Sequence, residues 1–290
     1  MNAHRRRVRS STDGVMLSVV DWTDGDAAAE APNPPVLLVH GLASNARLWD
    51  AVAADLAARG HQVAAVDQRG HGQSDKPDDG YDFETIGNDL AAVLDAFGWE
   101  SAVIVGQSWG GNVAVEFAID HEDRTLASIG IDGGYIELSR RIETWEKAIE
   151  LLSPPHLEGL AAERMRAAMH AANPDWSDLA IDGAMACFEI RSDGTIAPWL
   201  SRARHIEILR HLWPHKAIER LHLVRRPVVF IPAASAVDDE WSIAKRSLLE
   251  ELEPLDNVEI RWMTGVHDLH AQHPAAVAAH IADVAARTTP

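Results

Sequence analysis

The sequence predicts a doubly wound α/β fold, with a mostly parallel sheet and an inserted helical cap. Short apolar runs alternate with helix-period segments over residues 36–131 and again after residue 227. This alternation predicts parallel strands joined by right-handed crossovers. Residues 135–223 have a largely helical pattern, interrupted by prolines, and no convincing strand. We therefore expect a core of residues 1–134 and 224–290 and a cap of residues 135–223.

The individual elements follow from the spacing of apolar residues. Residues 16–22 suit an antiparallel edge strand, and the small residues and prolines of 25–35 predict a mobile connection. Continuously apolar runs predict buried strands, and apolar residues three and four apart predict helices. In chain order we expect strands at 36–39, 62–66, 102–105, 126–131, 228–231 and 258–263, and helices at 46–59, 84–97, 109–119, 240–252 and from 274.

Composition excludes several classes of function. The formal net charge is −18, which argues against binding to nucleic acid or to anionic membranes and is typical of a well-solvated surface. Cys187 is the only cysteine, so no intramolecular disulfide forms, as suits a reducing compartment. The basic run at residues 5–7 is followed by no apolar segment long enough for a secretory signal or a membrane span. We expect a soluble, cytoplasmic protein.

Residues 106–111, Gly-Gln-Ser-Trp-Gly-Gly, directly follow one of the predicted buried strands and open a helix. Such a turn exposes the side chain of Ser108 above the sheet, and the glycines let neighbouring backbone segments approach. The start of the helix offers free N–H groups to a developing oxyanion. A phosphate-binding turn is the alternative, but the chain contains no G-x-G-x-x-G or G-K-[ST] motif. Ser108 is the candidate nucleophile.

The Ser108 turn, the sequence His40-Gly41-Leu42 and the loop at residues 67–74 together resemble the α/β-hydrolase superfamily. The resemblance extends over nearly the whole chain, and residues 135–223 match the family's cap. It implies an oxyanion hole made by the backbone N–H groups of Leu42 and Trp109. The loop at 67–74 carries turn glycines, and we interpret it as structural.

The resemblance also implies a histidine base after the last strand. His267 stands closest to the end of that strand and seven residues before Pro274, which is similar to the family spacing. His270 and His273 are its rivals, and His273 is better explained as a residue at the helix entry. A glycine is more usual in the family at the position of Val266. We take His267 as the general base.

The acid of the triad has two candidate positions. The position most used in the family, after the strand that follows the cap, falls in residues 232–237, which contain no carboxylate. Asp238 and Asp239 come later and suit a helix N-cap. Some members of the family place the acid before the cap, where Asp132 stands in the sequence Ile-Asp-Gly-Gly. We favour Asp132 over Asp238, because a strand end fixes geometry better than a loop.

These residues predict acyl transfer by a Ser108-His267-Asp132 triad on a neutral, fairly apolar ester, lactone or thioester. In the family, dehalogenases and epoxide hydrolases use an aspartate nucleophile, which Ser108 argues against. Cofactor-free C–C bond hydrolysis or lyase chemistry, or a ligand receptor with little turnover, are the alternatives. We expect a small-molecule substrate, no cofactor and no metal, since His211, His215 and His222 match no zinc-binding spacing.

Overall fold

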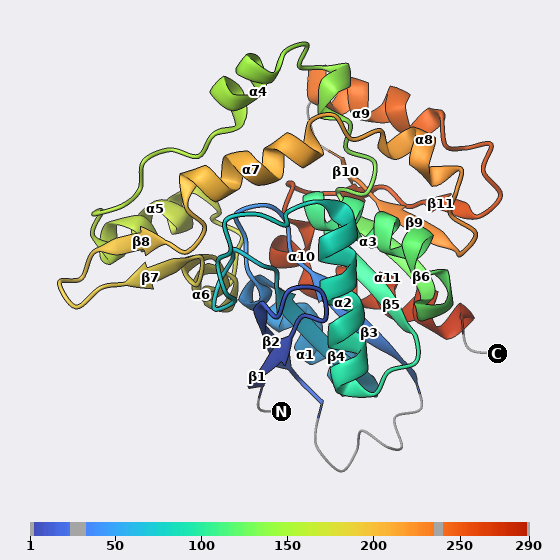
Figure 1. The fold of residues 1–290 in the computed structure, drawn as a ribbon, viewed down its shortest axis with the longest axis horizontal. Helices are drawn as coiled ribbons and strands as arrows, with labels where there is room; N and C mark the ends of the chain where they lie inside the picture. The colour runs from blue at the N-terminus through green and yellow to red at the C-terminus, as the bar shows by residue number, and fades with distance from the viewer. Residues whose placement is uncertain (1–2, 24–32, 235–239, 289–290) are drawn as a thin grey trace.

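The computed structural model describes residues 3–23, 33–234 and 240–288. Within them, helices cover both faces of an eight-stranded sheet with the order β1-β2-β4-β3-β5-β6-β9-β11 (Figure 1). The pairs β1–β2 and β2–β4 are antiparallel, and the other neighbours are parallel. The strands are β1 (His4–Arg9), β2 (Met16–Asp21), β3 (Asn33–Val39), β4 (His61–Asp67), β5 (Ala102–Gln107), β6 (Thr125–Ile131), β9 (Val228–Ile231) and β11 (Val258–Ile260). The predicted doubly wound fold is confirmed.

The N-terminal edge of the sheet differs from the prediction in two ways. β2 is not the edge strand, because β1 pairs along its outer side. β1 reads His-Arg-Arg-Arg-Val-Arg, and only Val8 in it is buried, so it lacks the apolar pattern of a strand. Its arginines instead pair with Asp21, Asp67 and Asp75. The expected connection at 25–35 is shorter, since residues 33–35 belong to β3; its residues 25–32 lie outside the described part of the chain.

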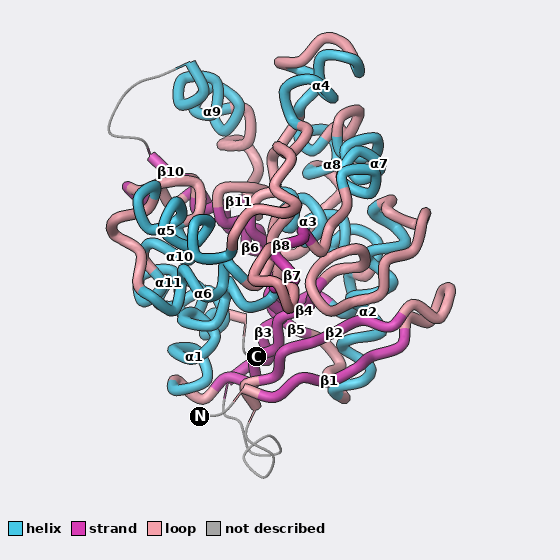
Figure 2. The backbone as a smooth tube through the Cα atoms, turned by 90° about the vertical axis from the view of Figure 1, so that its left-hand side faces the viewer, coloured by secondary structure: helices cyan, strands magenta, loops and turns pink. Residues whose placement is uncertain are grey.

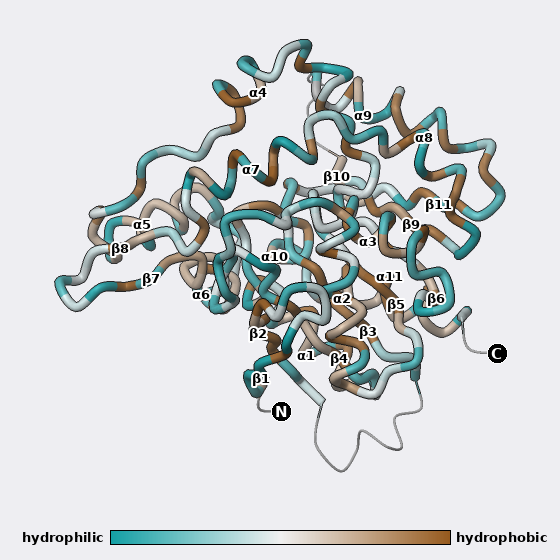
Figure 3. Tube along the Cα trace, in the orientation of Figure 1, coloured by the Kyte–Doolittle hydropathy of each residue, from teal (hydrophilic) through white to brown (hydrophobic). Residues whose placement is uncertain are grey.

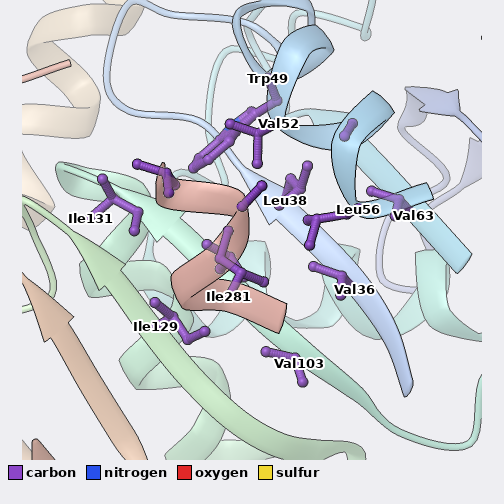
Figure 4. Close-up of a cluster of buried hydrophobic side chains, with 14 of the residues drawn as sticks. Val36, Leu38, Trp49, Val52, Leu56, Val63, Val103, Ile129, Ile131 and Ile281 are labelled. Atoms are coloured by element: carbon purple, nitrogen blue, oxygen red, sulfur yellow. The ribbon is translucent and has the colours of Figure 1, made fainter. Parts of the chain in front are cut away.

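Two helical layers enclose the sheet because alternate residues of each central strand face opposite sides. Val36 and Leu38 pack under α1 (Asp50–Ala58) and α11 (Pro274–Arg287), in the cluster drawn in Figure 4. Their neighbours Leu37 and Val39 pack under α2 (Phe83–Phe97) and α3 (Trp109–Asp120). Figure 2 shows the strands between these two layers. Figure 3 shows the strongest hydropathy along the central strands, as a sheet buried on both faces requires.

The cap leaves the sheet after β6 and returns at β9, and it lies above the upper end of the strands in Figure 1. It consists of α4 (Trp145–Leu152), α5 (Ala162–Ala172), α6 (Asp178–Met185), β7 (Phe188–Ile190), β8 (Ile196–Pro198), α7 (Arg202–Leu212) and α8 (Ala217–Leu221). The expectation that this stretch holds no strand is wrong, because β7 and β8 form an antiparallel hairpin. Each strand has three residues, too few for an alternating pattern to be visible. The hairpin turn uses Gly194 at φ +79° and the side chain of Asp193, which accepts from the Thr195 amide.

The C-terminal part of the chain places two short segments at the end of the sheet. The expected strand at 258–263 is divided: β11 stays in the main sheet, whereas β12 (Met263–Thr264) pairs with β10 (Ala233–Ala234). α9 (Glu240–Glu250) precedes β11, and α10 (Leu269–Gln272) leads into α11. None of the helices in the described ranges combines the length and the apolar character that a membrane span needs.

Candidate active site

Ser108 lies on a sharp turn between β5 and α3. Its backbone has φ +53° and ψ −126°, a conformation that a residue with a side chain adopts only under constraint. The Ser108 amide donates to the carbonyl of Ile131, and the Ser108 carbonyl accepts from Gly111. A Cβ atom on Gly133 would lie 2.5 Å from Cα of Ser108, so only glycine fits there. The surrounding backbone therefore holds Ser108 in its strained position.

The loop after β3 passes beside this turn. A Cβ atom on Gly41 would lie 3.1 Å from Cβ of Ser108, so the loop and the serine are in close contact. Leu42 lines a cavity together with Ser108, and Trp109 is the first residue of α3. The Ala43 amide donates to Nε2 of His71, which fixes the loop that contains Leu42. Leu42 thus lines the same cavity as Ser108, and Trp109 directly follows Ser108 in the chain.

The loop at 67–74 is hydrogen-bonded to its surroundings rather than open to a ligand. The buried carboxylate of Asp67 accepts from the amides of Ala46 and Gln73. The hydroxyl of Ser74 donates to the Asp67 carbonyl and accepts from the Ser18 amide. These bonds join the loop to the start of the helix after β3 and to β2. Its observed contacts are structural.

His267 and Asp132 form a close pair at the end of the sheet. Nδ1 of His267 lies 2.7 Å from Oδ2 of Asp132. Asp132 directly follows β6 and adopts φ +41°, and its side chain is 5% exposed. Burial raises the pKa of Asp132, but the bond to His267 and the charges of His267 and Lys245 outweigh it and lower the pKa. Burial lowers the pKa of His267, but Asp132 more than compensates and raises it.

Further donors fix the carboxylate of Asp132. Oδ1 accepts from the hydroxyl of Tyr135 at 2.9 Å, from the amide of Ala233 at 3.0 Å and from Nζ of Lys245 at 2.6 Å. Sequence reasoning did not single out Lys245. It lies on a helix 113 residues from Asp132, and nothing in its local sequence distinguishes it from an ordinary surface lysine. Only the tertiary structure brings it to the site.

The rival residues for the base and the acid occupy other places. His270 is fully buried against the ring of Trp49, and burial lowers its pKa to about 3, so it stays neutral. His273 precedes α11 as its N-cap residue. Asp238 and Asp239 lie outside the described residues. Of the three histidines considered as base, His267 is the one that contacts Asp132.

Two cavities meet at His267. A cavity of about 270 Å³ is lined by both Ser108 and His267, together with Leu42, Gln107 and Asp268. A second cavity, of about 780 Å³, is lined by His267, Asp132 and Lys245 and by apolar residues of the segment before α4 and of α9. Within the described residues, no hydrogen bond joins Ser108 to His267, and the two side chains face the same space. Such bonds are often long or absent in enzymes without substrate.

A site with a constrained serine, a histidine beside it and a carboxylate on that histidine is chemically suited to nucleophilic catalysis. Among the described residues, no three His, Cys, Asp or Glu side chains gather as metal ligands. His215, one of the cap histidines, bonds instead to Glu116 of α3.

Part of the chain is similar to known α/β hydrolases. A family model described as alpha/beta hydrolase fold matches residues 34–172. An AB hydrolase superfamily protein of Bacillus subtilis, YisY, is 36% identical over 88 residues, which cover 30% of this chain and 33% of that protein. Epoxide hydrolase B of Mycobacterium tuberculosis is 37% identical over 108 residues, or 37% of this chain and 30% of that protein. The match thus spans about a third of the length of these curated relatives.

A similar solved structure covers the whole fold. The crystal structure of E-2-(acetamidomethylene)succinate hydrolase superposes with a TM-score of 0.77 at 23% identity and covers 98% of this chain and 99% of that chain. At this identity the likeness shows the fold, which includes both the sheet and the cap. Together with the strand order, the strained serine turn and the match of the family model, it shows that the chain has the α/β-hydrolase fold.

Proposed function

We propose that the protein is a serine hydrolase that works by acyl transfer through Ser108, His267 and Asp132. The observation that carries the proposal is the 2.7 Å contact between His267 and Asp132 beside a cavity that His267 shares with Ser108. A histidine held by a carboxylate keeps the tautomer that accepts a proton from serine, and the carboxylate stabilises the imidazolium that forms.

The proposed reaction has two steps. His267 takes the hydroxyl proton of Ser108 while the serine oxygen attacks the substrate carbonyl, and the N–H groups of Leu42 and Trp109 stabilise the oxyanion. The protonated His267 then gives its proton to the leaving group, and an acyl-enzyme forms. In the second step His267 activates water, which releases the acyl group and restores Ser108.

A neutral, fairly apolar ester, lactone or thioester fits this site best. Apolar side chains line much of the cavity at Ser108: Leu42, Leu48, Met169, Trp176 and Phe188. Its volume of about 270 Å³ is at the small end of ligand pockets, which favours short acyl groups. The serine nucleophile favours acyl transfer over the epoxide opening that the name of one relative describes, because the latter uses a carboxylate nucleophile within this family.

A fluorophosphonate probe tests the proposal directly. The probe should modify Ser108, as mapped by mass spectrometry, and Ser108→Ala should abolish both labelling and hydrolysis of p-nitrophenyl butyrate. The acetate and butyrate esters should react faster than the palmitate ester. A folded protein whose Ser108 stays unlabelled would contradict the proposal. Labelling of Ser108 without turnover of any ester in the panel would instead favour C–C bond cleavage or a ligand-binding role.

A further inference from the structure

A lysine from a distant helix lies at the centre of the site. Nζ of Lys245, on α9, donates to Oδ1 of Asp132 at 2.6 Å and to the carbonyl of Ala233 at 3.0 Å. The side chain of Lys245 is 22% exposed, and that of Asp132 is 5% exposed. A charge-assisted bond that is largely removed from water and supported by a second acceptor holds its partners in a defined geometry. Lys245 therefore has a fixed place beside Asp132.

The two oxygens of Asp132 have different partners. Oδ2 faces His267, whereas Oδ1 accepts from Tyr135, Ala233 and Lys245. Tyr135 and Ala233 are neutral donors, so Lys245 supplies the positive charge on the Oδ1 side. Because both oxygens are engaged, the carboxylate has no freedom to rotate. The contacts on Oδ1 consequently determine how Oδ2 is presented to the imidazole.

The charged groups around His267 act in opposite directions. Asp132, after β6, and Asp268, the next residue in the chain, favour the protonated imidazole. Lys245, from α9, disfavours it by repulsion and by offsetting the charge of Asp132. His270, from α10, is neutral. The pKa of His267 is raised in the balance, and it would be raised further without Lys245.

We propose that Lys245 is a positioning residue of this site, which fixes the Asp132 carboxylate and offsets part of its charge so that His267 serves as a base at lower pH than Asp132 alone would allow. The inference rests on the proposed function of His267 and Asp132. It explains why Lys245 lies against Asp132, although protonated His267 already gives that carboxylate a positively charged partner.

The titration of His267 tests this without any substrate. We would follow histidine ring resonances by NMR as a function of pH in isotope-labelled protein, and use His267→Gln to assign the signal. In Lys245→Met the titration midpoint of His267 should move to higher pH. In Lys245→Arg, which keeps the positive charge, the midpoint should stay close to that of the wild type. Lys147→Met is the matched control, because Lys147 pairs with Glu150 on the exposed face of α4.

The pH profile of ester hydrolysis supplies the second measurement. In Lys245→Met the acid limb of kcat/KM should shift upward, with a several-fold loss below pH 7 and a smaller change on the plateau. Circular dichroism verifies folding, and Lys245→Gln replaces Lys245→Met if the latter does not fold. A His267 midpoint in the Lys245 variant equal to that in Lys147→Met would overturn the inference.

The two proposals fail in different ways. If the His267 midpoint rises in Lys245→Met but the wild-type protein hydrolyses no ester, the link between Lys245 and His267 stands and the proposed function is wrong. If Ser108 is labelled and esters are hydrolysed, but the midpoint does not move, the proposed function stands and the inference about Lys245 is wrong.

Discussion

At the scale of single residues, the site depends on the carboxylate of Asp132, which the sequence alone offered as one of two candidate acids. Asp132 is held by four donors, three of them on Oδ1 (Tyr135, Ala233 and Lys245) and one, His267, on Oδ2. A carboxylate with this many partners is ionised and immobile. Those two properties are what the orienting acid of a triad needs.

Replacing this carboxylate gives a sharp prediction. Asp132→Asn should lower kcat for p-nitrophenyl butyrate by about 10³–10⁴-fold, because an amide no longer selects the productive tautomer of His267 or stabilises its charged form. Asp238→Asn, the other candidate acid, should leave kcat within about threefold of the wild type. A normal rate in Asp132→Asn together with a collapsed rate in Asp238→Asn would reverse the assignment.

The pH dependence of activity follows from the direction of the His267 pKa. His267 must be neutral to act as a base, and Asp132 raises its pKa above the ordinary value of 6.5. Activity should therefore increase as the pH rises through a midpoint above 6.5, in plots of kcat/KM against pH. In Asp132→Asn the residual activity should have a midpoint at lower pH. An acid limb below 6.5 in the wild type would disagree with the observed contacts.

At the scale of elements, the cap is attached to the core through buried polar groups. The side chain of Glu116, on α3, is 4% exposed and accepts from Nε2 of His215 at 2.8 Å and from Nε of Arg220 at 2.9 Å. His215 lies between α7 and α8, and Arg220 lies in α8. On the other side of the cap, Asn45 donates to the carbonyl of Gly183 in α6. The helix that follows Ser108 thus also carries the cap.

Breaking this attachment should destabilise the protein. Glu116→Ala leaves the buried ring of His215 without its acceptor and deprives Arg220, whose side chain is 37% exposed, of its ion-pair partner, so we expect the free energy of unfolding to fall by about 1–3 kcal/mol. Urea denaturation followed by circular dichroism measures the change. Glu150→Ala, which breaks an exposed pair on α4, should cost less than about 1 kcal/mol. Equal effects of the two substitutions would mean that Glu116 does not anchor the cap.

At the scale of the whole molecule, charge is unbalanced, with 44 acidic and 26 basic residues. Many of the basic side chains are engaged in ion pairs at the surface, so the remaining excess of carboxylates repel one another. Exposed pairs contribute little each, whereas the net repulsion acts over the whole surface. Self-repulsion should therefore dominate the response to salt.

Thermal unfolding at different ionic strengths tests this balance. Raising the salt concentration from about 0.01 M to about 0.15 M shortens the screening length from about 30 Å to about 8 Å. Tm at pH 8 should increase by a few degrees, because screening weakens the repulsion more than it weakens the surface pairs. Near pH 5.2, where the net charge approaches zero, the increase should vanish. A Tm that falls with salt at pH 8 would show that ion pairs dominate.

Local patterns in the sequence determined most of the sheet and the position of the serine turn. Buried strands such as β5 and β9 are continuously apolar, and the glycines around Ser108 mark a turn that other residues do not fit. Patterns of this kind are local, so they are visible without the fold. β1 was not predicted, because ion pairs rather than an apolar pattern stabilise it. The β7–β8 hairpin was not predicted, because its strands are too short to show an alternating pattern.

Only the tertiary structure decided which side chains surround Asp132. His267 is 135 residues away from it in the chain and Lys245 is 113 residues away, and no local pattern encodes either contact. They meet because β6, β9 and β11 are neighbours in the sheet, so the segments that follow these parallel strands lie side by side at one edge. The sequence by itself determined the serine and a choice of acids, and the order of the strands determined the partner of the histidine.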